Sequence, residues 1–128
     1  MIDESATAKP PSAVALRDVS IAFRLSGGGV YTAVAGASLQ VADGEFVSIV
    51  GPTGCGKSTL LNVAAGLLAP ASGRVDIYGS SLSALNRQAG YLFQADALFP
   101  WKPALENVAI GLETDGVPLA DARPRAQD

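Results

Sequence analysis

Residues 51–58 read GPTGCGKS, a glycine-rich octapeptide that ends in a lysine and a hydroxyl side chain. The spacing fits the pattern G-x-x-x-x-G-K-[ST], in which each fixed position has a physical role. The glycines let the backbone take unusual conformations and approach a ligand closely, and successive amide groups form an anion-binding nest. A helix that begins here would add partial positive charge at its N-terminus. The octapeptide therefore predicts a site for a phosphate chain.

Two side chains of this loop are expected to act on the phosphates. Lys57 should reach the β- and γ-phosphates, and Ser58 should offer its hydroxyl to the accompanying Mg²⁺. Cys55 occupies a variable position of the pattern, where we interpret it as a small filler residue. The residues of the loop expected to contact the nucleotide are Gly51, Pro52, Thr53, Gly54, Cys55, Gly56, Lys57, Ser58 and Thr59.

The flanking sequence is expected to place this loop between a strand and a helix. Residues 46–50, FVSIV, form an almost wholly apolar run, which is typical of a strand buried on both faces. Residues 57–68, KSTLLNVAAGLL, have apolar side chains around most of the helical axis and predict a buried helix. Pro70 and Gly73 follow and end it. The motif thus lies where its mechanism requires.

Further elements are expected on both sides of this unit. Strands are predicted at residues 13–23, 32–41, 74–79 and 89–93. A glycine loop at 24–30 and an Asp43-Gly44 turn separate the early strands. A second helix is predicted at 104–112, after which the sequence becomes polar. This order predicts an α/β protein with extra strands before the phosphate loop.

Composition restricts the class of protein. A chain of 128 residues with 48% hydrophobic and 16% charged residues is large enough for one domain with its own core. The net charge of -3 argues against a nucleic-acid partner, which needs a basic face. No apolar run approaches the ~20 residues of a membrane-spanning helix. Residues 1–12 have no apolar segment of a secretory signal and are expected to be a disordered tail.

Beyond the loop, the sequence resembles the ATP-binding subunit of ABC transporters from about Val14 to Pro118. The likeness is carried by LRDVSIAF at 16–23, by GEFVSIVGPTGCGKSTLLNVAAGLLAPASGRVDIYG at 44–79, and by GYLFQADALFPWKPALENVAIGLE at 90–113. The letters LFPW are similar to importers of nitrate, sulfonate or taurine type. The resemblance implies that residues 13–128 form a P-loop NTPase core with an N-terminal antiparallel β subdomain.

The resemblance also implies roles for residues outside the loop. In the family an aromatic residue at the end of the first strand stacks on adenine, and Phe23 stands in the matching place, with Tyr31 a poorer candidate. A glutamine that closes the strand after the helix contacts Mg²⁺ and the γ-phosphate, and Gln94 matches it. The segment Leu98 to Trp101 matches one that leads toward the membrane subunits. Its side chains either form an exposed docking surface or pack in a core.

Several parts of the family pattern are not found in this sequence. No apolar run ends in Asp-Glu, so the Walker B strand is absent, and there is no histidine. The letters LSGGG at 25–29 resemble the LSGGQ motif of the family, but they precede the phosphate loop and are interpreted as a hairpin loop. We therefore expect the N-terminal part of a cassette, truncated before the helical subdomain and the Walker B strand.

The function implied by this resemblance is binding of ATP and Mg²⁺, with hydrolysis in the full-length parent. The parent would pair with a second ATP-binding subunit and with membrane subunits at the cytoplasmic face of the cell membrane, and would energise solute import. The chain alone is expected to hydrolyse ATP slowly and to be marginally stable or prone to aggregation, because residues 46–50 would lack neighbouring strands. Three alternatives stay open: a small P-loop kinase, a non-transport ABC ATPase, and a nucleotide-binding module without turnover.

Overall fold

The computed structural model describes residues 12–95 and 97–127. The chain divides into two units, Met1–Gly90 and Tyr91–Asp128, and each is described by itself. Residues 1–11, which make up nearly all of the expected N-terminal tail, lie outside the described residues.

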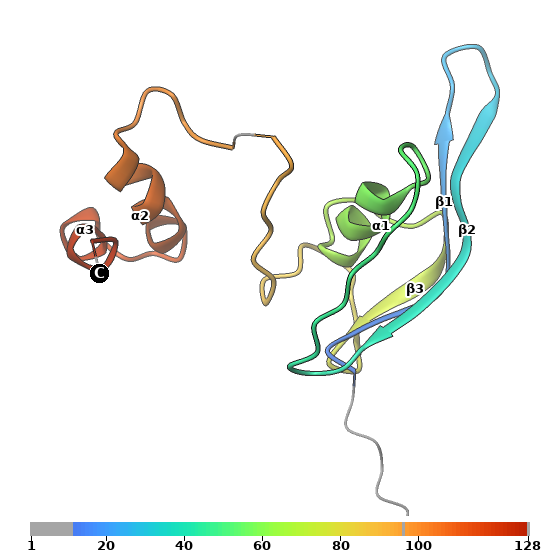
Figure 1. Ribbon diagram of the computed structural model, residues 1–128, viewed down its shortest axis with the longest axis horizontal. Coiled ribbons are helices and arrows are strands. Elements are labelled where there is room, and N and C mark those ends of the chain that lie inside the picture. The colour runs from blue at the N-terminus through green and yellow to red at the C-terminus, as the bar shows by residue number, and fades with distance from the viewer. Residues whose placement is uncertain (1–11, 96, 128) are drawn as a thin grey trace, which may run out of the picture. The chain divides into compact units, whose positions relative to one another are not determined.

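An antiparallel sheet is the framework of the first unit (Figure 1). Strands β1 (Val14–Arg24) and β2 (Val30–Val41) form a long hairpin. Strand β3 (Ser72–Ile77) pairs with β1, and the short β4 (Ser80–Ser81) completes the order β2-β1-β3-β4. The hairpin closes through Leu25 N–H, which donates to Gly29 O at 2.8 Å. The interpretation of LSGGG as a hairpin loop is confirmed.

The hydrophobic core of this unit lies between the sheet and helix α1 (Lys57–Ala64), which covers one face of the sheet in Figure 1. A β-bulge interrupts the alternation of β1 between Leu16 and Val19, and Asp18 within it has a φ of 49°. The bulge lets both Leu16 and Val19 face the core although they are three positions apart. The buried cluster comprises Leu16, Val19, Ile21, Val63, Val75 and Ile77.

Helix α1 is shorter and more exposed than the sequence predicted. It ends at Ala64 instead of Leu68, because the chain turns at Gly66, whose φ is 73° and whose N–H donates to Val63 O. Val63 is the buried residue of the helix, whereas Leu61 is 49% exposed. The prediction of a helix buried around most of its axis is therefore wrong.

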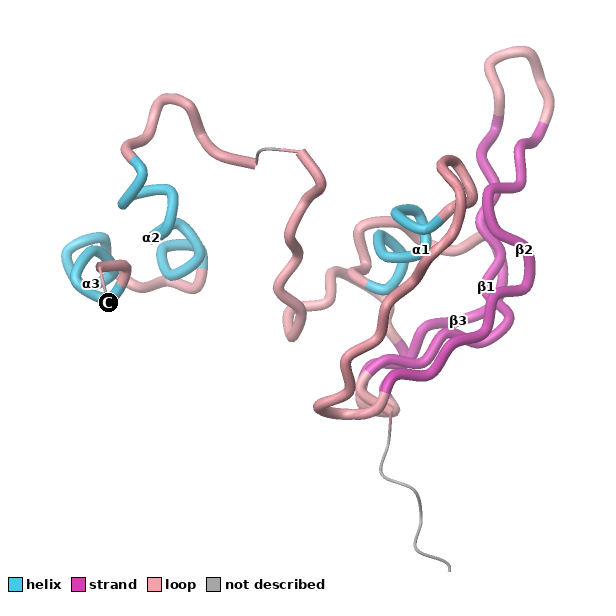
Figure 2. Tube along the Cα trace, in the orientation of Figure 1, coloured by secondary structure: helices cyan, strands magenta, loops and turns pink. Residues whose placement is uncertain are grey.

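Two predicted strands do not form. Residues 46–50 and 89–93 have no ladder partner among the described residues, and Figure 2 shows both stretches as loop. Phe46 and Val50 are 94% and 86% exposed, so the expectation of a strand buried on both faces is wrong. The turn before this segment does form, with Glu45 N–H donating to Ala42 O at 3.2 Å.

The second unit contains two helices, α2 (Ala104–Thr114) and α3 (Leu119–Arg125). Helix α2 confirms the helix predicted at 104–112, whereas α3 lies in the polar stretch where no helix was expected. Ala109 of α2 and Ala122 of α3 are fully buried. Across residues 12–95 and 97–127, no helix has the length and apolar character needed to cross a membrane.

Candidate functional site

The glycines of the loop at 51–56 allow left-handed backbone angles at some positions and close approach of neighbouring atoms at others. Gly54 and Gly56 have φ of 82° and 92°, in the left-handed region that favours glycine. A Cβ at Gly56 would also lie 2.7 Å from Ala33 O of β2, so the loop and the sheet approach closely there. Gly51 does not have a positive φ, contrary to the expectation, but a Cβ there would lie 2.9 Å from the Sγ of Cys55.

The amide groups at the end of this loop are available to a ligand. Helix α1 begins after Gly56 without a side-chain cap and without an acidic residue in its first turn. Its first N–H groups therefore have no intrahelical acceptor, and the helix dipole adds partial positive charge. Among the described residues, no hydrogen-bond acceptor is found for the backbone N–H groups of Gly54, Gly56, Lys57, Ser58 and Thr59.

The side chain of Lys57 folds back toward the loop that precedes it. Its Nζ donates to Gly51 O at 2.8 Å and to Pro52 O at 2.7 Å, and lies 3.5 Å from the Sγ of Cys55. The ammonium group is thus held beside the loop by neutral carbonyl groups, with no carboxylate paired to it among the described residues. An incoming phosphate would provide a charge-assisted partner in place of these carbonyls.

A pocket of about 260 Å³ joins the loop to the β1–β2 hairpin. Phe23 of β1 and Tyr31 of β2 line it on one side and are 39% and 51% exposed. The structure thus brings the aromatic residue predicted for the base next to the residues predicted for the phosphates. The remaining lining residues are Ala33, Gly54, Gly56, Lys57, Ser58 and Thr59.

Tyr31, the poorer of the two aromatic candidates in the sequence, lines the same pocket as Phe23. It is the direct cross-strand partner of Phe23 in the β1–β2 ladder. Opposite residues of an antiparallel pair present their side chains on the same face. The signal in the sequence was an aromatic residue on each side of a glycine loop, but the pairing register decided that the two would meet.

Gln94 belongs to the second unit, where it lies in an exposed bend after Phe93. Its assignment to Mg²⁺ stays a prediction. Asp76 is buried in β3 and pairs with Arg17 at 3.0 Å and Arg74 at 3.3 Å, which gives it a structural role in the sheet. Within the described part of the chain, no group of three acidic, histidine or cysteine side chains could hold a metal ion.

The segment Leu98 to Trp101 is exposed instead of packed in a core. Leu98 and Trp101 are 70% and 74% exposed, and the rings of Phe99 and Trp101 lie 5.2 Å apart. Asn107 of α2 holds this segment in place: it accepts from Phe99 N–H at 2.7 Å and donates to Lys102 O at 3.0 Å. The role of Asn107 was not predicted, because an asparagine within a predicted helix gives no sign of these bonds.

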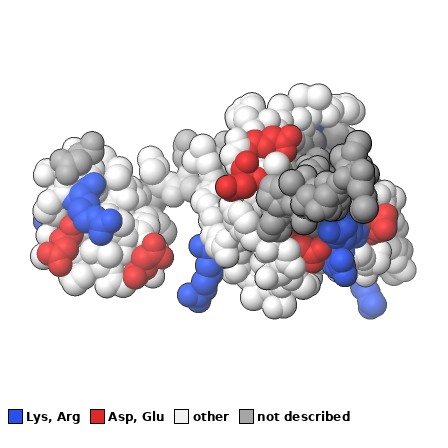
Figure 3. All heavy atoms as spheres, turned by 90° about the horizontal axis from the view of Figure 1, so that it is seen from below, with Lys and Arg blue, Asp and Glu red and all other residues white. Residues whose placement is uncertain are grey.

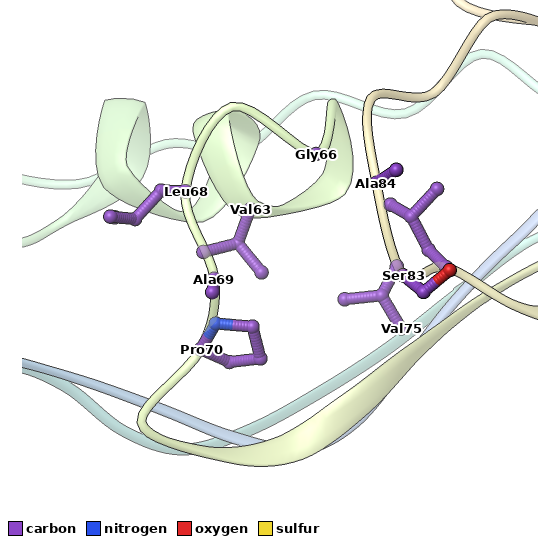
Figure 4. Close-up of a pocket in the computed structure, with 9 residues that line it drawn as sticks. Val63, Gly66, Leu68, Ala69, Pro70, Val75, Ser83 and Ala84 are labelled. Carbon is purple, nitrogen blue, oxygen red and sulfur yellow. The ribbon is translucent and has the colours of Figure 1, made fainter.

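Two other surfaces lack the features that the loop offers to a nucleotide. A hollow of about 80 Å³ lies between the C-terminal end of α1 and β3, where Val63, Pro70 and Val75 line it (Figure 4). This hollow is less than a third of the size of the pocket beside the loop, and no charged side chain lines it. On the face seen in Figure 3, basic and acidic side chains are interspersed among uncharged ones and form no continuous basic tract.

Comparison with known proteins gives the family of the chain. The ABC transporter family model matches residues 34–128, which include the loop. The taurine import ATP-binding protein TauB of Jannaschia sp. (strain CCS1) is 41% identical over 108 residues, covering 84% of this chain and 40% of that protein. The bicarbonate transport ATP-binding protein CmpC of Synechococcus elongatus is 42% identical over 100 residues, covering 78% of this chain and 15% of that protein.

The fold is shared with a solved structure. The dimeric, post-hydrolysis state of the ATP-binding cassette MJ0796, bound to ADP and Pi, has a TM-score of 0.79 and is 32% identical, covering 89% of this chain and 54% of that one. The chain therefore spans about half of a solved cassette and less than half of the curated relatives. With its α/β fold, its phosphate loop and these relatives, the chain belongs to the ABC transporter family.

Proposed function

We propose that this chain binds MgATP as the N-terminal part of the ATP-binding subunit of an ABC importer. The observation that carries the proposal is the pocket in which Lys57, the open amides of the α1 N-terminus and two exposed aromatic rings come together. The amides and Lys57 recognise the phosphates, and Phe23 stacks on the base. The family match argues against the alternative of a small P-loop kinase.

Magnesium would be held by few protein groups. The hydroxyl of Ser58 lies at the first turn of α1, and Gln94 is proposed to add its amide oxygen. This donor set fits Mg²⁺, which prefers oxygen ligands and takes most of them from water and from the nucleotide phosphates. When bound, the ion neutralises charge on the β- and γ-phosphates. Ser58 and Gln94 would orient the ion, and Lys57 would stabilise the phosphate oxygens.

The wider assembly is proposed from the relatives. Relatives named as import ATP-binding proteins suggest membrane subunits as partners, at the cytoplasmic face of the cell membrane. The solved cassette MJ0796 was determined as a dimer, so a second ATP-binding subunit is proposed as well. The exposed Leu98 to Trp101 segment supplies an apolar surface for the membrane subunits, since its large side chains are mostly in solvent.

Titration of a fluorescent ATP analogue tests the phosphate site. Lys57→Ala removes the ammonium group, and we expect a loss of affinity of at least about tenfold, the effect of losing one charged hydrogen bond. Lys102→Ala is the matched control, because Lys102 lies in the second unit, near Glu106 and Glu113. Equal affinity of the Lys57→Ala chain and the unsubstituted chain would contradict the proposal.

A further inference from the structure

Two aromatic side chains line the pocket at its hairpin end. Phe23 and Tyr31 are paired directly across the β1–β2 ladder. Both line the pocket that also contains Gly54, Lys57 and Ser58. A ligand that reaches from the loop toward the hairpin therefore meets both rings.

In the described part of the chain, the Tyr31 side chain has no polar or ring contact that would give it a structural role. The two remaining tyrosines have partners: Tyr78 donates a hydrogen bond to Asp43 at 2.7 Å, and Tyr91 packs against Phe93 with ring centroids 4.7 Å apart. No hydrogen bond, ion pair or ring contact of the Tyr31 side chain is found among the described residues, and the residue is 51% exposed. A half-exposed ring without a structural partner has its surface free for a ligand.

The chemistry of the pocket favours stacking over hydrogen bonding at its hairpin end. Its lining there consists of Phe23, Tyr31 and Ala33, with no amide or carboxylate side chain to read the edge of a base. Aromatic rings bind a base through its face, and each ring contributes separately because every base has such a face. We therefore expect the affinity for a base at this end of the pocket to depend on the area of aromatic ring that contacts it.

We propose that Tyr31 is a second base-contacting residue, which forms with Phe23 a two-ring platform for the base of the nucleotide. The inference rests on the proposed function, since it requires a nucleotide with its phosphates on the Lys57 loop. The aromatic ring of Tyr31 makes the contribution, and its hydroxyl group is secondary.

The test uses the full chain and measures how well unlabelled ATP and tripolyphosphate displace a fluorescent ATP analogue. Tripolyphosphate has the phosphate chain but no base. We expect Tyr31→Ala to weaken ATP about tenfold, as for the loss of one stacking ring, and to leave tripolyphosphate unchanged. Tyr31→Phe keeps the ring and should stay within about twofold of the unsubstituted chain. Tyr78→Ala is the matched control, because Tyr78 lies outside the pocket.

The outcomes separate the inference from the proposed function. If Tyr31→Ala and Tyr78→Ala bind ATP equally well, the second platform residue is refuted while nucleotide binding stands. If Tyr31→Ala weakens tripolyphosphate as much as ATP, the residue acts on the loop and not on the base, which also overturns the inference. If neither compound displaces the analogue from the unsubstituted chain, the proposed function itself fails. Circular dichroism of each variant checks that the sheet is retained.

Discussion

Gly54 and Gly56 both have left-handed backbone angles, but only Gly56 is crowded by the neighbouring strand. A Cβ at Gly54 would meet nothing within 4 Å, whereas one at Gly56 would lie 2.7 Å from both Ala33 O and Val34 Cγ2. Gly54→Ala should therefore cost only the backbone strain, about 1 kcal/mol of the free energy of unfolding. Gly56→Ala adds overpacking against β2 and should cost about 3 kcal/mol. Urea denaturation followed by circular dichroism measures both.

Gly27→Ala is the control for these two substitutions. Gly27 lies in the hairpin loop without a positive φ, and a Cβ there has open space. Gly27→Ala should change the free energy of unfolding by less than about 0.5 kcal/mol. Equal effects of Gly54→Ala and Gly56→Ala would show that contact with β2 does not decide the conformation of the loop.

At the scale of residues, the sequence predicted what depends on local spacing. The positions of Lys57 and Ser58 relative to the glycines are fixed within one octapeptide, and in the structure both residues line one pocket with Gly54 and Gly56. The placement of Tyr31 in this pocket depends on its alignment with Phe23 across the hairpin. That register is set by a bulge and by loop geometry, which a single sequence does not specify.

The segment at residues 46–50 exposes large apolar side chains beside backbone groups that have no ladder partner among the described residues. Phe46 is 94% exposed, and the segment has no ladder partner among the described residues. Such an unpaired apolar segment is a template for pairing with another chain. Phe46→Lys should reduce self-association, measured by sedimentation velocity at several protein concentrations. It should leave the free energy of unfolding within about 0.5 kcal/mol, because the side chain is already in solvent.

Val108→Lys tests whether self-association depends on the unpaired backbone of residues 46–50 or on exposed apolar side chains in general. Val108 is 65% exposed but lies on α2, where the backbone groups are already bonded within the helix. We expect it to reduce self-association less than Phe46→Lys. An equal reduction by the two substitutions would indicate that the free backbone of residues 46–50 has no part in the association.

At the scale of elements, the sequence predicted those whose bonds are local or formed within a hairpin. Strands β1 and β2 were predicted to within two residues, because a glycine loop joins them and they pair with each other. The strands predicted at 46–50 and 89–93 did not form, because an apolar run indicates burial but cannot supply a partner strand. Helix α3 was missed because its sequence is polar and contains Pro124. Its buried residue, Ala122, gives little hydrophobic signal.

For the chain as a whole, the residues proposed to bind the base and the phosphates belong to one unit. Phe23, Tyr31 and Lys57 line a single pocket, whereas Gln94 belongs to the second unit. The proposed nucleotide binding therefore involves only residues of the first unit, whereas the proposed Mg²⁺ contact involves Gln94 of the second. Hydrolysis needs still more, because a water molecule must be polarised in line with the γ-phosphate.

That last requirement predicts that this chain binds ATP without turning it over efficiently. Phosphoryl transfer depends almost wholly on positioning and electrostatics, and the sequence contains no apolar run ending in Asp-Glu to supply the polarising carboxylate. Phosphate release from ATP and Mg²⁺ should therefore be no faster with this chain than with Lys57→Ala purified in the same way. Chelation of Mg²⁺ should leave the measured rate unchanged. A rate that exceeds that of Lys57→Ala and disappears on chelation would mean that another group of this chain activates the water.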